Sequence, residues 1–149
     1  MTRTELLRFM RRYRLGVVTS CAEDGQPQAA VVGIAISDSF EIVFDSLDTT
    51  RKVRNLRADP RTAMVLGGVH PPEERTVQLE GIADEPQGEE LERLKKLYYL
   101  VYPDGPSRRG WDGLVYVRVR PSWIRYSDFH TSPPDVVEFT AASLADGIG

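Results

Sequence analysis

Hydroxyl and basic side chains gather in the segment from Phe44 to Asn55, where an apolar, strand-like run gives way to a short helical pattern. Ser46 and Thr50 follow the strand-like run, and Arg51 and Lys52 open the helical pattern. The start of a helix presents free N–H groups and the positive end of the helix dipole. An arginine can grip a phosphate through two parallel hydrogen bonds, and a lysine can bind it as a point charge. These residue types in this order therefore fit a phosphate-binding helix terminus.

A second interpretation of the same segment needs no ligand. Thr49 or Thr50 can cap the helix, and Arg51 and Lys52 can then stand on a solvated helix face. Capped basic helices are common, so the local pattern taken alone favours this second interpretation. The predicted elements around the segment are needed to choose between a phosphate site and a capped, solvated helix.

Thiol and imidazole groups are few. The chain has one cysteine, Cys21, and two histidines, His70 and His130. A lone cysteine forms no internal disulfide and fits a reducing cytoplasm. Cys21 lies in an apolar run, where a packed small side chain is expected in preference to a reactive thiol. The histidines lie far apart in loop-like contexts without zinc-ligand spacing, so no metal site is expected.

Composition narrows the class of protein. A chain of 149 residues suits one domain, and a hydrophobic content of 41% can fill a core. A formal charge of −3 argues against general binding to nucleic acid or membrane surfaces. No apolar run approaches the roughly 20 residues that cross a bilayer, and residues 1–14 lack a secretory apolar stretch. We therefore expect a cytoplasmic protein with no nucleic-acid and no membrane partner.

Periodicity predicts the elements that must position the Phe44–Asn55 segment. Helices are expected over Thr4–Arg14 and Glu89–Val101, with a short one from about Thr50 to Ala58. The strand-like segments are Leu15–Cys21, Gln28–Ile36, Phe40–Asp45, Thr62–Leu66, Arg75–Ala83, Leu114–Val119 and Ser122–Tyr126. Turn residues at short spacing make hairpin connections dominant, which indicates antiparallel pairing.

The predicted fold class is mainly β (α+β), a six- to seven-stranded antiparallel split barrel with two or three flanking helices. The barrel domain is expected to span residues 1–130. Residues 131–149 are expected to form a C-terminal tail, for which packing on a partner subunit is one option. Within the tail, residues 139–145 fit either a short helix or a mobile segment.

The order of these elements and motifs closely resembles the pyridoxamine 5′-phosphate oxidase-like family of FMN-binding split barrels. The resemblance runs from about Leu6 to Phe129. The motifs that carry it are Gly25-x-Pro27, Thr50-Arg51-Lys52, Asn55-Leu56, Asp59-Pro60-Arg61 and the closing Trp123-Ile124-Arg125. The resemblance implies a homodimer with the cofactor at the subunit interface.

The resemblance also implies site residues. It implies that Arg51 and Lys52 hold the FMN phosphate and that Asp45 and Ser46 lie beside the ribityl chain and phosphate. Thr50 adds a hydroxyl donor next to them.

Three further segments complete the expected site. The resemblance implies that the backbone of Ala30, Val31 and Val32 runs along the isoalloxazine ring. It places Thr76 at the position of a polar contact to the flavin. Trp123 and Arg125 are candidates to complete the site from the partner subunit, and further candidates are Trp111 and Arg108 or Arg109.

This sequence departs from the family oxidases at three places. The segment Gln28-Ala29-Ala30 holds no second phosphate-binding arginine, Thr76 stands where they have a glutamine, and their C-terminal Arg-x-His motif is absent. Pyridoxamine phosphate oxidase activity is therefore not expected. The missing arginine leaves room for a deazaflavin coenzyme in place of FMN.

The leading interpretation is an FMN-dependent oxidoreductase in which a small organic molecule or a reduced nicotinamide exchanges hydride with the ring. The alternatives are a deazaflavin-dependent reductase, a non-catalytic flavin-binding or redox-sensing protein, and a degenerate barrel without cofactor. No residue of the chain stands out as the catalytic acid or base.

Overall fold

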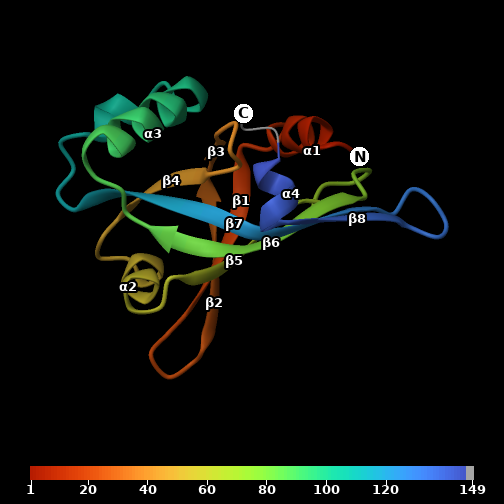
Figure 1. Cartoon of the computed structure of the whole chain (residues 1–149). Coiled ribbons are helices and arrows are strands. Elements are labelled where there is room, and N and C mark those ends of the chain that lie inside the picture. The colour runs from red at the N-terminus through yellow and green to blue at the C-terminus, as the bar shows by residue number, and fades with distance from the viewer. Residues whose placement is uncertain (147–149) are drawn as a thin grey trace.

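One strongly curled antiparallel sheet makes up most of the molecule (Figure 1). In the computed structural model, which describes residues 1–146, the sheet has eight strands. They are β1 (Leu15–Cys21), β2 (Pro27–Gly33), β3 (Ala35–Ile36), β4 (Ile42–Leu47), β5 (Arg61–Gly67), β6 (Arg75–Asp84), β7 (Leu114–Asp128) and β8 (Asp135–Thr140). The order is β2-β1-β5-β6-β7-β4-β3, with β8 beside β7. The predicted mainly β split barrel is confirmed.

Strand β7 changes partner halfway along its length. Its first half pairs with β4 and its second half with β8, while β6 lies along its other side. The register against β6 shifts between Glu80 and Gly81, so Ser122 has no residue opposite it. Pro121 beside it lacks a backbone donor, which fits a bulge. The two last strands expected from the sequence are therefore one bent strand of 15 residues.

Two helices close the interior of the curled sheet. Helix α1 (Arg3–Met10) starts with a capping box between Thr2 and Glu5 and buries Leu6 and Met10 completely. Helix α2 (Arg51–Ala58) directs Val53 and Leu56 into the same apolar core. The core of β1, β4, β5, β6 and β7 is thus covered, and α2 is fixed by its apolar face.

Helix α3 (Gly88–Val101) packs on the other side of β3 and β4, away from the main core (Figure 1). Leu94 and Tyr98 join Ala35, Val43 and Tyr116 in a second, smaller apolar cluster. The 3₁₀ helix η1 (Gly105–Arg108) follows and leads into β7. Helix α3 therefore creates a second layer with its own cavity.

Several bounds differ from the prediction. Helix α1 ends at Met10, because Arg11 forms its C-cap. The strand expected over Phe40–Asp45 begins only at Ile42, since Phe40 has a left-handed backbone (φ 63°), and it continues to Leu47. Strand β8 was not predicted.

Residues after 130 extend the same sheet. Strand β8 pairs with β7 of its own chain, and helix α4 (Ala141–Ala145) follows it. Phe139 and Leu144 from this part are buried in the main core. The division at residue 130 and a contact of the tail with a partner subunit stay predictions, and residues 147–149 lie outside the described part.

Helices long and apolar enough to cross a membrane are absent from the described part of the chain.

Candidate functional site

A concavity of about 430 Å³ lies between the β1–β2 hairpin and the start of α2. Its lining residues are Val18, Ser20, Gln28, Ala29, Ala30, Thr50, Arg51 and Lys52. The hairpin projects beyond the body of the sheet, and α2 lies at the same end of the molecule (Figure 1). The structure thus brings together Ala30, Thr50, Arg51 and Lys52 of the predicted site residues.

The start of α2 lacks the neutralising groups that α1 has. Thr2 and Glu5 satisfy the first N–H groups of α1. At α2 the Thr50 side chain makes no such cap, because its hydroxyl donates to the Leu47 carbonyl at 2.9 Å. The first turn of α2 also contains no acidic residue. Its N–H groups and positive dipole end are therefore available to an anion.

Side-chain charges add to this helix terminus. At the opposite end of α2, Arg57 binds the Glu85 carboxylate with two contacts of 2.8 Å. Within residues 1–146, Arg51 and Lys52 have no comparable carboxylate partner. Arg51 is exposed and Lys52 is half-buried. Two cations therefore face the concavity uncompensated, which favours a phosphate group there.

An asparagine fixes the width of the concavity. The Asn55 side-chain amide donates to Ser20 Oγ at 3.1 Å and to Gln28 Oε1 at 2.9 Å. These bonds join α2 to both strands of the hairpin. Sequence reasoning quoted Asn55 in a motif without giving it a role; its place one turn after Arg51 was the available signal.

Ser46 lies directly beneath the start of α2. Its hydroxyl is 3.1 Å from Thr50 Oγ1, and the residue is buried. It supports Thr50 from inside and does not line the concavity.

Asp45 points the other way, because neighbouring side chains of a strand alternate between faces. Tyr98 donates its hydroxyl to Asp45 Oδ1 at 2.9 Å, and Arg108 donates Nε to Oδ2 at 2.9 Å. Burial and the negative charge of Asp45 raise the pKa of Tyr98. In this structure Asp45 therefore anchors α3 and η1 and does not reach the concavity at α2.

Strand β2 supplies the third wall. Ala30 lines the concavity, Val32 is buried, and Val31 faces outward with 66% of its surface exposed. Among the described strands, β2 ends the sheet order and pairs only with β1. Backbone groups on its free side can therefore meet a planar ligand.

Thr76 and Trp123 lie elsewhere in the same protomer. Thr76 is on β6, which is separated from β2 by β1 and β5. Trp123 is on β7, one strand further, and its indole donates to Glu138 at 3.3 Å. One protomer does not bring these two residues to the concavity.

An apolar strip runs over the outward face of the first three strands. Val17 lies opposite both Val31 and Val65 in the register, so the three side chains share one face. Val31 and Val65 are exposed, at 66% and 41%. We call Val17, Val31 and Val65 the valine strip.

The curled sheet and the split partners of β7 define a split-barrel protein, and α2 gives it an uncapped, basic helix terminus. Residues 2–128 match the family model described as "Pyridoxamine 5'-phosphate oxidase", and the chain belongs to this family. No curated protein matches the chain in sequence.

Solved structures of similar fold bind different groups. A heme-binding protein from Mycobacterium smegmatis has a TM-score of 0.82 at 18% identity, covering 97% of this chain and 60% of its own length. An FMN-binding protein related to pyridoxamine 5′-phosphate oxidase, from Nostoc punctiforme PCC 73102, has a TM-score of 0.66 at 9% identity, with coverages of 93% and 86%. An FAD-binding protein from Mesorhizobium loti has a TM-score of 0.67 at 21% identity, with coverages of 85% and 92%. At these identities the likeness concerns the fold.

Proposed function

We propose that this protein binds FMN, with the phosphate at the start of α2. The observation that carries the proposal is the uncapped helix terminus beside Arg51 and Lys52, facing Ala30 across the concavity. The family to which the chain belongs and the flavin-binding proteins among its structural neighbours support it. In this proposal Arg51, Lys52 and Thr50 bind the phosphate, and Ser46 holds Thr50 in place.

In this proposal the residues of β2 would hold the ring of FMN. The free side of β2 at Ala30, Val31 and Val32 offers backbone N–H and C=O groups to the polar edge of an isoalloxazine. Asp45 contributes indirectly in this arrangement, because its bonds to Tyr98 and Arg108 fix the strand that leads to α2.

We further propose that two copies complete the site. The valine strip gives each protomer an apolar face next to β2, and apolar faces of this kind are buried in dimers. Thr76 and Trp123 cannot reach the concavity of their own protomer, so they would approach the flavin of the other copy.

The bound flavin would supply hydride-transfer chemistry, and the chain would supply binding and orientation. We propose an FMN-dependent oxidoreductase that acts on a small organic molecule, with a reduced nicotinamide as donor. Oxidation of reduced nicotinamide by the holoprotein separates this function from that of a flavin carrier or redox sensor.

The phosphate assignment is tested by comparing FMN with riboflavin, which lacks the phosphate. The double variant Arg51→Ala/Lys52→Ala is expected to weaken FMN binding by about a hundredfold, because two charge-assisted contacts are lost. Riboflavin affinity should change by no more than about threefold. Fluorescence titration of the apoprotein measures both affinities.

Arg54→Ala is the matched control, since Arg54 is an exposed cation on the same helix outside the concavity. It should leave both affinities close to those of the parent. An equal loss of FMN and riboflavin in the double variant would refute the assigned role of Arg51 and Lys52.

A deazaflavin coenzyme is the second candidate, for which the absence of an arginine at Ala30 leaves room. The Ala30 methyl group adds no cation to the concavity, so the phosphate there relies on α2 alone. Mass spectrometry distinguishes the two cofactors because their masses differ.

A further inference from the structure

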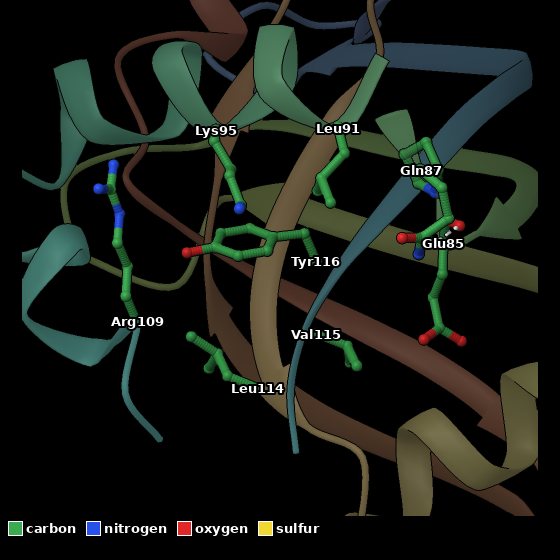
Figure 2. A pocket seen from close by; sticks show the side chains of 9 residues that line it. Glu85, Gln87, Leu91, Lys95, Arg109, Leu114, Val115 and Tyr116 are labelled. Atoms are coloured by element: carbon green, nitrogen blue, oxygen red, sulfur yellow. Dashed lines mark hydrogen bonds between the residues drawn. The ribbon is translucent and has the colours of Figure 1, made fainter. Parts of the chain in front are cut away.

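A second cavity, of about 240 Å³, lies between α3 and the start of β7 (Figure 2). It is lined by Glu85, Pro86, Gln87, Leu91, Lys95, Arg109, Leu114, Val115 and Tyr116. None of these residues lines the concavity at α2. It is therefore a separate site, which the proposed FMN site does not use.

One end of this cavity is cationic. Lys95 comes from α3 and Arg109 from the segment after η1, and both lie on the same side of the pocket in Figure 2. Within residues 1–146, Arg109 makes no ion pair; its Nε donates to the Tyr99 hydroxyl at 3.4 Å. Lys95 pairs with the exposed Glu92 at 3.3 Å, and its ammonium lies 5.5 Å from the centre of the Tyr116 ring. Surface pairs of this kind contribute little, so both charges can turn to a bound anion.

Two tyrosine hydroxyls lie beside the cations. Tyr99 and Tyr116 are joined through their hydroxyl oxygens at 3.0 Å. The pair has two hydroxyl hydrogens and this contact uses one, while Arg109 adds a further donor to Tyr99. One hydroxyl hydrogen therefore remains for an acceptor. The Tyr116 hydroxyl points toward the cationic side of the cavity (Figure 2).

The middle of the cavity is apolar, between the cationic end and the end formed by Glu85 and Gln87. Leu91 lies above the Tyr116 ring, and Leu114 and Val115 lie below it (Figure 2). The acidic lining residue, Glu85, stands on the side away from Lys95, and Arg57 holds its carboxylate through two contacts of 2.8 Å. Glu85 is thus held away from the cationic end, where the exposed Glu92 pairs with Lys95.

Size limits the ligand. Sites for drug-sized molecules enclose about 300–1,000 Å³, and this cavity encloses about 240 Å³. A small molecule with about one ring fits this volume. The apolar walls favour an organic anion, because its apolar body covers them. An inorganic anion would leave the same walls exposed to water.

We propose that this cavity binds a small organic acid. The carboxylate would lie between Lys95 and Arg109, beside the Tyr99–Tyr116 hydroxyl pair, and the apolar body would lie between Leu91 and Leu114. The site is a second ligand-binding site of the chain, independent of the cofactor.

Benzoate is a suitable probe, with benzamide as its neutral counterpart. Two-dimensional NMR of the labelled holoprotein should show benzoate shifting the amide signals of Leu91, Lys95 and Leu114 to Tyr116. The signals of Ala30, Arg51 and Lys52 should stay in place. Benzamide should bind at least about tenfold more weakly, because the ionic contacts are lost.

Variants test the cationic end. Lys95→Met and Arg109→Met keep the apolar stem and should each weaken benzoate by about tenfold. Lys96→Met removes the same charge from the exposed neighbour of Lys95, and should leave binding unchanged. Thermal unfolding checks that each variant is folded.

The proposal would be overturned by absence of benzoate binding at millimolar concentrations, by equal binding of benzamide, or by shifts confined to the residues at α2. Unchanged benzoate affinity in the Lys95→Met/Arg109→Met double variant would also refute it. If either variant unfolds, the NMR map of the parent protein still decides.

Discussion

At the start of α2, two cationic side chains meet a helix terminus that no carboxylate of residues 1–146 neutralises. Arg51 and Lys52 supply the charge, and Thr50 leaves the N–H groups free because its hydroxyl is turned to Leu47. Asn55 then joins the helix to Ser20 and Gln28. Each side chain has one physical task, so each can be tested alone.

Glu73 gives a prediction about acid stability. Hydrogen bonds from Arg75, with a further one from Tyr13, lower the pKa of Glu73 from its ordinary 4.5 to about 2. Ionised Glu73 therefore stabilises the fold above pH 4.5, and this stabilisation is lost as the pH falls toward 2. Glu73→Gln should lower Tm at neutral pH and flatten its decline between pH 4.5 and 2.

Thermal unfolding at a series of pH values measures this slope. Glu74→Gln, at the exposed neighbour, is the control and should keep the parent profile. A Glu73→Gln profile parallel to that of the parent would contradict the role given to this carboxylate.

Residues could be predicted from sequence where their chemistry is local. Arg51 and Lys52 were assigned correctly to a helix start, because charge and helix position are features of adjacent residues. The partners of Asp45 could not be predicted in the same way, since Tyr98 and Arg108 lie 53 and 63 residues away. Only the fold shows which face of β4 carries that carboxylate.

Among the elements, β8 shows how a polar segment can become part of a sheet. Residues 131–138 carry two prolines and several polar side chains, which is typical of a loop. The second half of β7 offers a free edge once β4 has ended, and β8 pairs there. This pairing depends on tertiary structure, so periodicity could not predict it.

Removing the main anchor of β8 should be costly. Phe139 is 7% exposed and packs in the main core. Phe139→Ala is expected to lower the free energy of unfolding by about 3 kcal/mol. Val136→Ala, on the same strand and 39% exposed, should cost less than about 1 kcal/mol.

Urea unfolding followed by circular dichroism gives both values. Similar costs for the two variants would mean that β8 is not a structural part of the barrel. The comparison therefore tests the element as well as the residue.

At the scale of the whole molecule, the strand order places α2 and α3 on different layers. The short connections between successive strands were enough to predict the antiparallel barrel, because short connections allow few other strand topologies. The second layer under α3 could not be predicted. Ala35, Val43 and Tyr116 are far apart in the sequence, and only the pairing of their strands brings them together. The cavity of Figure 2 is a product of that layer.

The valine strip predicts the oligomeric state. The parent protein should sediment as a dimer at micromolar concentration, and Val31→Glu/Val65→Glu should sediment as a monomer, because charged groups would be buried at the contact. Leu100→Glu, at an 82% exposed position on α3, should stay dimeric. A monomeric parent protein, or a dimeric double variant, would contradict the proposed interface.

The central claim, that a flavin phosphate binds at the start of α2, is tested most directly by mass spectrometry of the ligand released from the purified protein. The account predicts a yellow protein that releases FMN in a ratio near one per chain. It also predicts a higher Tm for the apoprotein when FMN is added, because a ligand of the native state stabilises it. A colourless protein that releases no flavin and whose Tm does not change with FMN would contradict the claim.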